Sequence, residues 1–221
     1  MRQTSPAPPP SALQTVLQLF LSLMVVATLG FIMASWAQIS TQPLPARDTP
    51  SQVMRLPSLF TPEVRHWSAS IARWAATYDL DPLLVATVMQ IESCGDPRAV
   101  SHAGARGLFQ VMPYHFEDGE NALDPETNAR RGLGYLRQML NRTDGDVRLA
   151  LAAYNGGPAR LQEPEAHWPR ETRLYVHWGW GIYRDAQAGL DRSATLEEWL
   201  MAGGRHLCRQ AHANLPLSPS E

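Results

Sequence analysis

The sequence predicts an all-α domain, and three observations support this prediction. Beyond about residue 61, apolar residues recur three and four positions apart, which is the spacing of one face of a helix. Several of these stretches begin with Asp or Thr followed by Pro, a pair typical of a helix N-terminus. No stretch shows the every-second-residue alternation of a half-buried strand. We therefore expect a compact helical domain without internal repeats, preceded by a segment of different character.

The apolar sequence before the helical domain predicts a membrane-spanning helix. Residues 1–12 form a short tail, and within residues 13–37 the run from Val16 to Ala34 is mostly apolar and uncharged. As a helix this run would measure about 28 Å, close to the ~30 Å hydrocarbon core of a bilayer. Ser35-Trp36-Ala37 has the pattern of a signal-peptide cleavage site, but the run is longer than an ordinary signal-peptide core. We expect a transmembrane anchor, with a cleaved signal peptide as the alternative.

Both alternatives place the rest of the chain outside the cytoplasm. Arg2 precedes the apolar run, and positive charge stays on the cytoplasmic side of a membrane helix. We expect an extracytoplasmic protein of the cell envelope, anchored in the cytoplasmic membrane by its N-terminal helix or secreted after cleavage. Residues 38–60 are rich in Pro, Ser and Thr and are expected to form a linker.

Two helices are expected at the start of the domain, which we assign to residues 61–190. Thr61-Pro62 marks the start of the first helix, and Asp81-Pro82 marks the start of the second, which Gly95 ends. Their apolar faces consist of Val64, Trp67, Ile71, Trp74 and Tyr78 in the first helix and of Leu84, Val88 and Ile91 in the second.

A third and a fourth helix follow after a longer connection. Asp124-Pro125 begins the third, and Asp146 begins a short, alanine-rich fourth helix that stops at Asn155-Gly156-Gly157. The apolar face of the third helix consists of Ala129, Leu133, Leu136 and Leu140.

The last predicted helices are less regular. A fifth helix is expected from about Arg170 to Ala186, although Gly179 and Gly181 lower its helix propensity. Residues 191–221 are expected to hold one C-terminal helix and a polar tail. Thr195 with Glu198 forms a capping box for that helix, and Gly203-Gly204 ends it.

Composition excludes several classes of function. The net charge is −2 in 221 residues, which gives no electrostatic case for a nucleic-acid partner. The 19 basic residues are all Arg, so the chain has neither a P-loop lysine nor a lysine for a Schiff base. The two cysteines are too few for a cysteine-built zinc site, and the scattered His residues form no HExxH pair. We expect neither a metal nor another cofactor.

Glu92 stands out among the acidic residues. It lies four residues after Val88 and one after Ile91, so a helix places its carboxylate at the edge of the apolar face. It also lies in the last turn of that helix, where the negative end of the macrodipole disfavours an anion. Both effects favour the protonated carboxyl, which a general acid needs at neutral pH. By position alone, an ordinary solvent-exposed Glu at a helix end is the alternative.

Four short motifs follow one another from Glu92 onward. They are Glu92-Ser93, the run GLFQVMP from Gly107 to Pro113, the run YNGG from Tyr154 to Gly157, and Glu171-Thr172 followed by Tyr175-Val176. In this order and spacing they resemble the lytic transglycosylases related to the catalytic domain of soluble lytic transglycosylase, within the lysozyme-like superfamily. The resemblance covers residues 80–186, and it implies a goose-type-like, lysozyme-like helical fold.

The resemblance also implies roles for individual residues. Glu92 matches the single catalytic acid/base, Ser101 a serine that contacts muramic acid near the scissile bond, and Tyr154 the tyrosine that orients the catalytic carboxyl. From the residues alone, a packed tyrosine with a satisfied hydroxyl is the alternative for Tyr154. The implied substrate-binding residues are Ser101, Gln110, Met112, Tyr154, Asn155, Glu171 and Tyr175.

The chain departs from the family pattern in two places. Phe109 stands where the family most often has Met, which exchanges one apolar residue for another. His177-Trp178-Gly179-Trp180-Gly181 replaces the usual Lys- and Val-rich helix, which puts the far end of the cleft in doubt.

The implied reaction needs only one carboxylate. Ordinary glycosidases use two, whereas the resemblance supplies Glu92 alone. In the family, the corresponding Glu protonates the glycosidic oxygen after N-acetylmuramic acid (MurNAc), and the 2-acetamido group helps stabilise the cation-like centre. The same Glu then deprotonates the C6 hydroxyl, which closes a 1,6-anhydro ring without consuming water. A hydrolytic lysozyme of the same fold and a catalytically silent peptidoglycan-binding module are the alternatives.

Cys94 and Cys208 are expected to form a disulfide. An exported chain meets an oxidising compartment, where an even cysteine count is most simply explained by pairing. Such a bridge would tie the C-terminal helix to the end of the helix that carries Glu92. Two unpaired thiols, with Cys94 filling a small site, are the alternative.

Overall fold

The computed structural model describes residues 55–217 of the chain. The predicted anchor at residues 13–37 and most of the predicted linker lie outside the described residues. Among residues 55–217, no helix combines the length and the apolar character needed to cross a membrane.

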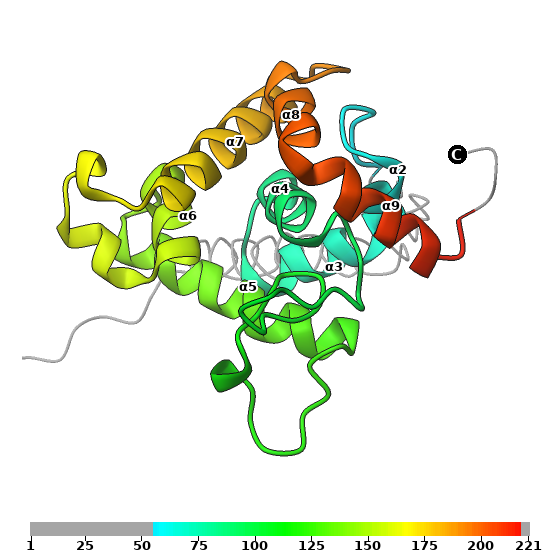
Figure 1. Cartoon of the computed structure of the whole chain (residues 1–221), viewed down its shortest axis with the longest axis horizontal. Coiled ribbons are helices and arrows are strands. Elements are labelled where there is room, and N and C mark those ends of the chain that lie inside the picture. Colours follow the sequence, from blue (N-terminus) through cyan, green and yellow to red (C-terminus); the bar gives the residue numbers. More distant parts are fainter. Residues whose placement is uncertain (1–54, 218–221) are drawn as a thin grey trace, which may run out of the picture. The chain divides into compact units, whose positions relative to one another are not determined.

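The described part of the chain is helical, as predicted (Figure 1). Its β-structure is limited to two isolated bridges, which join Arg106 to Val100 and to Val111. The α-helices are α2 (Pro62–Arg65), α3 (Ser68–Tyr78), α4 (Pro82–Ser93), α5 (Pro125–Arg142), α6 (Val147–Gly156), α7 (Arg170–Gln187), α8 (Ala194–Trp199) and α9 (Arg205–Asn214). Short 3₁₀ turns lie at Pro113–His115, Pro158–Gln162 and Glu165–His167, and one π turn lies at Leu200–Gly204.

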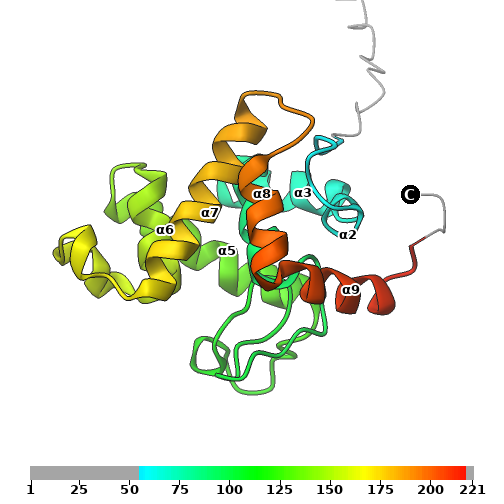
Figure 2. The same ribbon diagram turned by 45° about the horizontal axis from the view of Figure 1, so that its top comes forward.

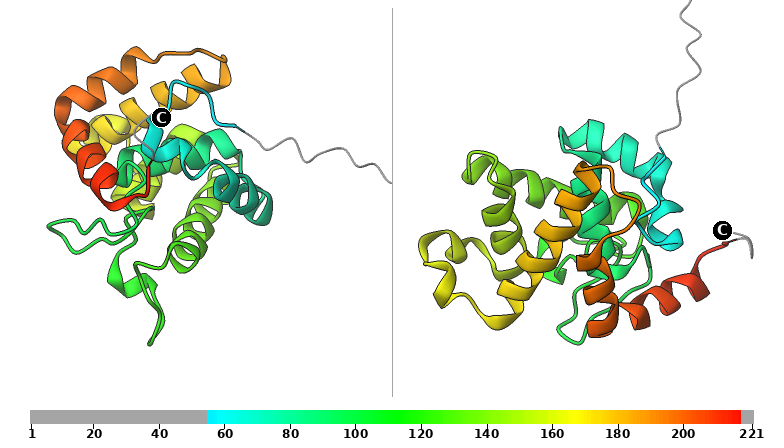
Figure 3. Two further views of the ribbon diagram at one scale, coloured as in Figure 1. Left: turned by 90° about the vertical axis from the view of Figure 1, so that its right-hand side faces the viewer. Right: turned by 90° about the horizontal axis from the view of Figure 1, so that it is seen from above.

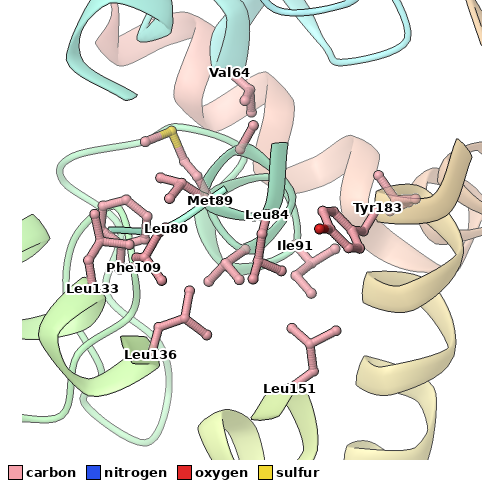
Figure 4. Packing of buried hydrophobic residues seen from close by; sticks show 14 of the residues in the cluster. Val64, Leu80, Leu84, Met89, Ile91, Phe109, Leu133, Leu136, Leu151 and Tyr183 are labelled. Atoms are coloured by element: carbon pink, nitrogen blue, oxygen red, sulfur yellow. The ribbon is translucent and has the colours of Figure 1, made fainter. Parts of the chain in front are cut away.

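Helix α4 runs through the centre of the fold, with α2, α3, α7 and α9 packed against it (Figure 1). Every residue from Leu84 to Ile91 is buried, as expected for a helix surrounded by protein on all sides. Figure 4 shows Leu84, Met89 and Ile91 meeting side chains from α5, α6 and α7. The helix that carries Glu92 is therefore fixed by the core.

The predicted starts of three helices are confirmed. The carboxylates of Asp81, Asp124 and Asp146 accept hydrogen bonds from the backbone N–H groups two or three residues further on. Helix α4 ends at Cys94, which adopts a left-handed conformation with φ 54°. Gly95 follows with φ 82°, and a Cβ there would lie 2.8 Å from the carbonyl oxygen of Glu63.

The prediction of one continuous helix at the start of the domain is wrong. The chain forms two helices, α2 and α3, which are separated at His66 and Trp67. The break allows the indole Nε1 of Trp67 to donate to the Gly95 carbonyl at 2.9 Å. The Thr61 side chain does not cap α2, because its hydroxyl donates to Oε1 of the buried Gln90 in the neighbouring helix.

The C-terminal region also differs from the expectation of a single helix. The hydroxyl of Ser193, not that of Thr195, accepts from Leu196 N–H and caps α8. Glu198 reaches across to His177 on α7 instead of forming a capping box. After the turn at Leu200–Gly204 the chain continues into α9, which lies beside α2 in Figure 2.

The core extends beyond the predicted domain limits on both sides. Leu56, Leu59 and Phe60, which the sequence analysis places in the linker, are at most 5% exposed. Trp199 and Ala211, from the predicted C-terminal region, join the same core. Residues 56–211 therefore share one hydrophobic core.

The predicted disulfide is confirmed: Cys94 and Cys208 are bonded to each other across 114 residues of sequence. The bridge joins the end of α4 to the middle of α9. Gln90 lies beside it, with its amide Nε2 donating to Cys94 Sγ at 3.2 Å.

Candidate active site

Most of the predicted site residues surround one hollow beside the end of α4. This hollow has a volume of about 300 Å³ and lies between the α4–α5 connection and the helices α5, α6 and α7. Seven of the eight predicted residues line it, namely Glu92, Ser101, Gln110, Met112, Tyr154, Asn155 and Glu171. The eighth, Tyr175, is buried on α7 and contacts Glu92 instead.

Glu92 presents a carboxyl group in a largely desolvated position. Burial, with a smaller contribution from the nearby charge of Glu171, raises its pKa from the ordinary 4.5 to about 8. The Tyr175 hydroxyl donates to Glu92 Oε1 at 2.7 Å and opposes this rise, since the bond favours the ionised form. With a pKa near 8, most Glu92 side chains carry a proton at neutral pH.

The prediction that Tyr154 orients the Glu92 carboxyl is not matched by the geometry. The Tyr154 hydroxyl donates to the backbone carbonyl of Phe109 at 2.8 Å, so it holds the α4–α5 connection. Tyr175 makes the contact that was assigned to Tyr154. Burial and the charge of Glu92 raise the pKa of both phenols well above its ordinary value, so both remain hydrogen-bond donors.

A close approach of two helices places Tyr175 opposite Glu92. Gly179 has no side chain where α7 meets α4, and a Cβ there would lie 3.3 Å from Ile91 Cδ1. Tyr175 lies one turn earlier on the same face of α7, while Glu92 follows Ile91 on α4. The glycine that lowered helix propensity in the sequence therefore serves the packing of the site.

Residues of the long connection between α4 and α5 form one wall of the hollow. The path of this connection can be followed in Figure 3. Ser101 Oγ accepts from Ala105 N–H at 3.0 Å, and Gln110 Nε2 donates to the Gly107 carbonyl at 3.0 Å. Gln110 itself has φ 46°, a left-handed conformation that few side-chain-bearing residues adopt. These bonds fix the shape of the connection without regular secondary structure.

Asn128 is a structural residue that sequence reasoning missed. It is fully buried on α5, where its Oδ1 accepts from Phe109 N–H and its Nδ2 donates to the carbonyls of Arg106 and Ala122. Gly107 is required beside it, because a Cβ there would lie 2.4 Å from Asn128 Nδ2. An amide next to Ala129, on the apolar face of the helix, was the available signal.

The outer part of the hollow carries a row of aromatic side chains. The rings of Tyr114 and His115, of His115 and Tyr135, and of Tyr135 and Tyr154 have centroid distances of 4.5, 5.2 and 5.7 Å. Tyr114 is 75% exposed. Sequence reasoning found only Tyr154 of this row, because Tyr114, His115 and Tyr135 lie outside the four motifs.

Asn155 and Glu171 complete the other wall of the hollow. Asn155 Oδ1 accepts from Thr172 Oγ1 at 2.9 Å, which ties the end of α6 to the start of α7. Glu171 lies in the first turn of α7 and is exposed. It is the second carboxylate of the hollow.

Among the described residues, one group of potential metal ligands comes close together, and it does not fit a metal. Glu63, Cys94 and Cys208 have ligand atoms within 4.8 Å of one another. The two sulfurs are bonded to each other, so neither is available as a thiolate ligand.

Comparison with known proteins identifies relatives for the part of the chain that carries this hollow. Residues 69–172 match the family described as the transglycosylase SLT domain. The transglycosylase of Enterobacteria phage PRD1 is 43% identical over 111 residues, which make up 49% of this chain and 40% of that protein. The membrane-bound lytic murein transglycosylase F 1 of Alkalilimnicola ehrlichii is 33% identical over 132 residues, or 56% of this chain and 26% of that protein.

An X-ray structure of the lytic transglycosylase Slt from Pseudomonas aeruginosa is also similar. The match covers 67% of this chain and 25% of that one, with a TM-score of 0.41 and 22% identity. This chain spans less than half the length of the two relatives named above.

Proposed function

We propose that the protein is a peptidoglycan lytic transglycosylase, because residues 69–172 match the family described as the transglycosylase SLT domain. It cleaves the β-1,4 bond between MurNAc and N-acetylglucosamine and leaves a 1,6-anhydro-MurNAc end. The observation that carries this proposal is the carboxyl of Glu92, which lines the hollow, is bonded by Tyr175 and has its pKa raised to about 8.

In the first step Glu92 acts as the general acid. Its protonated carboxyl gives a proton to the glycosidic oxygen, and the bond to the MurNAc anomeric carbon breaks. The 2-acetamido group of the same sugar stabilises the positive charge that develops at this carbon. Tyr175 keeps the carboxyl in place by donating to Oε1, and it supports the carboxylate that the proton transfer leaves behind.

In the second step the same residue acts as the base. The Glu92 carboxylate takes the proton of the MurNAc C6 hydroxyl, and the C6 oxygen bonds to the anomeric carbon. The ring closes and Glu92 regains its proton, so one carboxyl serves both steps and no water is consumed. A raised pKa suits this cycle because the group must be both a competent acid and a competent base near neutral pH.

Hydrolysis is the second candidate, and Glu171 is the observation that favours it. Its carboxylate lines the same hollow and is close enough to raise the Glu92 pKa. Most glycoside hydrolases use two carboxyl groups, one on each side of the glycosidic bond. The remaining alternative is a silent module that binds peptidoglycan and releases no product.

Mass analysis of the products tests the proposal directly. The full chain is incubated with purified peptidoglycan, and the released fragments are separated and weighed. We expect fragments with 1,6-anhydro ends. Fragments heavier by one water would establish the hydrolase, and the absence of any fragment would establish the silent module.

We also propose that the protein works in the cell envelope, at the cytoplasmic membrane. The apolar run at residues 13–37 supports this location, and the Alkalilimnicola ehrlichii relative is named as membrane-bound. Cell fractionation of a C-terminally tagged chain should find it in membranes after a salt wash. A released form that begins at Gln38 would show that the segment is a cleaved signal peptide.

A further inference from the structure

A second hollow lies next to the first. Its volume is about 560 Å³, and it shares Glu92, Ser101 and Gln110 with the hollow described above. The two hollows therefore meet at these three residues, one of which is Glu92. The sequence motifs gave no indication of the second one.

Helix α9 forms one wall of this second hollow. Leu207, Gln210, Ala213 and Asn214 line it, and their spacing of three and four residues places them on one side of the helix. The facing wall is the segment 96–100, which follows α4. Figure 3 shows the connection after α4 on the same side of the fold as α9.

Three ties fix α9 in this position. Cys208 is bonded to Cys94, and Asn214 Nδ2 donates to both carboxylate oxygens of Asp96 at 3.1 and 3.0 Å. His212 Nδ1 lies 3.2 Å from Glu63 Oε1. These three contacts hold α9 in place, so a ligand in the second hollow would meet a preformed surface.

The lining differs in chemistry from that of the first hollow. None of the described residues that line it is aromatic, whereas Tyr114, Tyr135 and Tyr154 line the first. Instead it offers the exposed guanidinium of Arg98, the amide of Gln210 and the exposed aliphatic side chain of Val100. Within residues 55–217 Arg98 forms no ion pair, and the carboxylate of Asp96, which also lines the hollow, accepts hydrogen bonds from Asn214 and from the Arg98 backbone N–H.

This lining fits a peptide that carries a carboxylate. An arginine binds a carboxylate through paired N–H groups, an amide side chain pairs with peptide groups, and aliphatic side chains pack on aliphatic ones. Sugar rings, by contrast, are commonly packed against aromatic faces. The first hollow offers such faces and the second does not.

If the proposed function is correct, such a peptide starts beside Glu92. The MurNAc residue at the scissile bond carries the short peptide of peptidoglycan, and that sugar must lie against the catalytic carboxyl. We infer that the second hollow binds this peptide, with Arg98 on its carboxylate and Gln210 of α9 on its backbone. The site selects peptide-bearing strands over bare glycan.

Binding measurements in an inactive background test this inference. The full chain with Glu92→Gln is titrated with a peptide-bearing glycan strand and with the same strand after enzymatic removal of its peptides. We expect the peptide-bearing strand to bind about tenfold more tightly, and Arg98→Gln to remove this difference. A tenfold change is what one charge-assisted hydrogen bond contributes. Gln210→Ala should reduce the difference by about threefold.

Arg209→Gln is the matched control, because Arg209 is also exposed on α9 but does not line the second hollow. It should leave both affinities unchanged, and thermal unfolding checks that each variant is folded. Equal binding of the two strands by the parent, binding of neither strand, or an equal loss on both strands with Arg98→Gln would overturn the inference. Failure of the proposed function would show differently, as Arg98-dependent binding without 1,6-anhydro products from the active chain.

Discussion

The two hollows that meet at Glu92 differ in both composition and origin. The first is lined by tyrosines and by residues of the four motifs, and its residues fall within the segment 69–172 that matches the SLT family. The second is walled by α9, which lies outside that segment, and it offers Arg98 and amides in place of aromatic rings. Glu92 therefore borders two surfaces of different chemistry, one formed within the segment that matches the family and one completed by a helix that follows this segment.

The largest effect is expected from removing the Cys94–Cys208 disulfide, which joins the end of α4 to α9. Cys208→Ala removes a disulfide between residues that are 114 positions apart in sequence. The entropy of closing such a loop in the unfolded chain corresponds to about 4–5 kcal/mol, which is an upper bound for the loss in the free energy of unfolding. Urea unfolding of the variant and of the parent, with and without a reductant, measures this loss. We expect the reductant to destabilise the parent and to leave the variant unchanged.

The same variant sharpens the comparison between the hollows. Since α9 walls only the second one, Cys208→Ala should weaken the binding of peptide-bearing strands more than that of bare strands, measured where the variant is still folded. An equal loss on both strands would show that the disulfide supports the whole site and not α9 alone.

The next largest effect concerns the group that both hollows share. Glu92→Gln keeps the size of the side chain but removes the proton donor, so turnover should fall by at least about 10²-fold while peptidoglycan is still bound. Release of 1,6-anhydro fragments measures turnover. Glu197→Gln, at an exposed position on α8, is the control and should have no effect.

Glu171 separates the two candidate reactions in the same assay. If Glu92 alone acts as acid and base, Glu171→Gln should lower turnover much less than Glu92→Gln does. Comparable losses in the two variants would support the hydrolase with two carboxyls.

A smaller effect separates the two tyrosines near the carboxyl. Tyr175→Phe removes a hydrogen bond that lowers the Glu92 pKa, so that pKa should rise above about 8 and the alkaline limb of the rate profile should move to higher pH. Turnover should fall by about tenfold, since the carboxyl loses one orienting bond. Tyr154→Phe should leave the alkaline limb in place, because its hydroxyl bonds Phe109. A limb that moves with Tyr154→Phe alone would reverse the assignment.

The raised pKa of Glu92 also predicts a dependence of stability on pH. The folded protein keeps the Glu92 proton up to about pH 8, whereas the unfolded chain releases it near pH 4.5, so stability falls as the pH rises between these values. Glu92→Gln removes this penalty. Its melting temperature should exceed that of the parent by at least about 2 °C at pH 8.5 and by less at pH 4. A constant difference across this range would contradict the raised pKa.

The smallest effect is expected at the end of α9. Asn214→Ala removes the two bonds to Asp96 that hold this end of the wall. The affinity for peptide-bearing strands should fall by about threefold, with bare strands unaffected. Asn141→Ala, at an exposed position at the end of α5, is the matched control. A loss on bare strands as well would show that the Asn214–Asp96 contact supports both hollows and not the second one alone.

Local signals in the sequence were sufficient for the helix starts, and the resemblance carried by the four motifs was sufficient for much of the first hollow. Asp81, Asp124 and Asp146 cap helices as predicted because a capping bond joins residues that are close in sequence. The resemblance predicted one site for Glu92, Gln110, Tyr154 and Glu171, and these four residues line the same hollow. The break at Trp67 and the cap at Ser193 were missed, because Trp67 is held by Gly95 and Glu198 by His177, both distant in sequence.

The helical class, the position of Glu92 at the edge of an apolar face and the pairing of the two cysteines could all be predicted from the sequence. Only the tertiary structure decided that Tyr175 and not Tyr154 bonds the carboxyl, that Asn128 holds the wall, and that α9 reaches the same site. The physical reason is that periodicity and capping act within a few residues of the chain. The contact of Glu92 with α7 and the position of α9 at the same hollow depend on how closely whole helices pack, and Gly179 allows a close approach because it has no side chain.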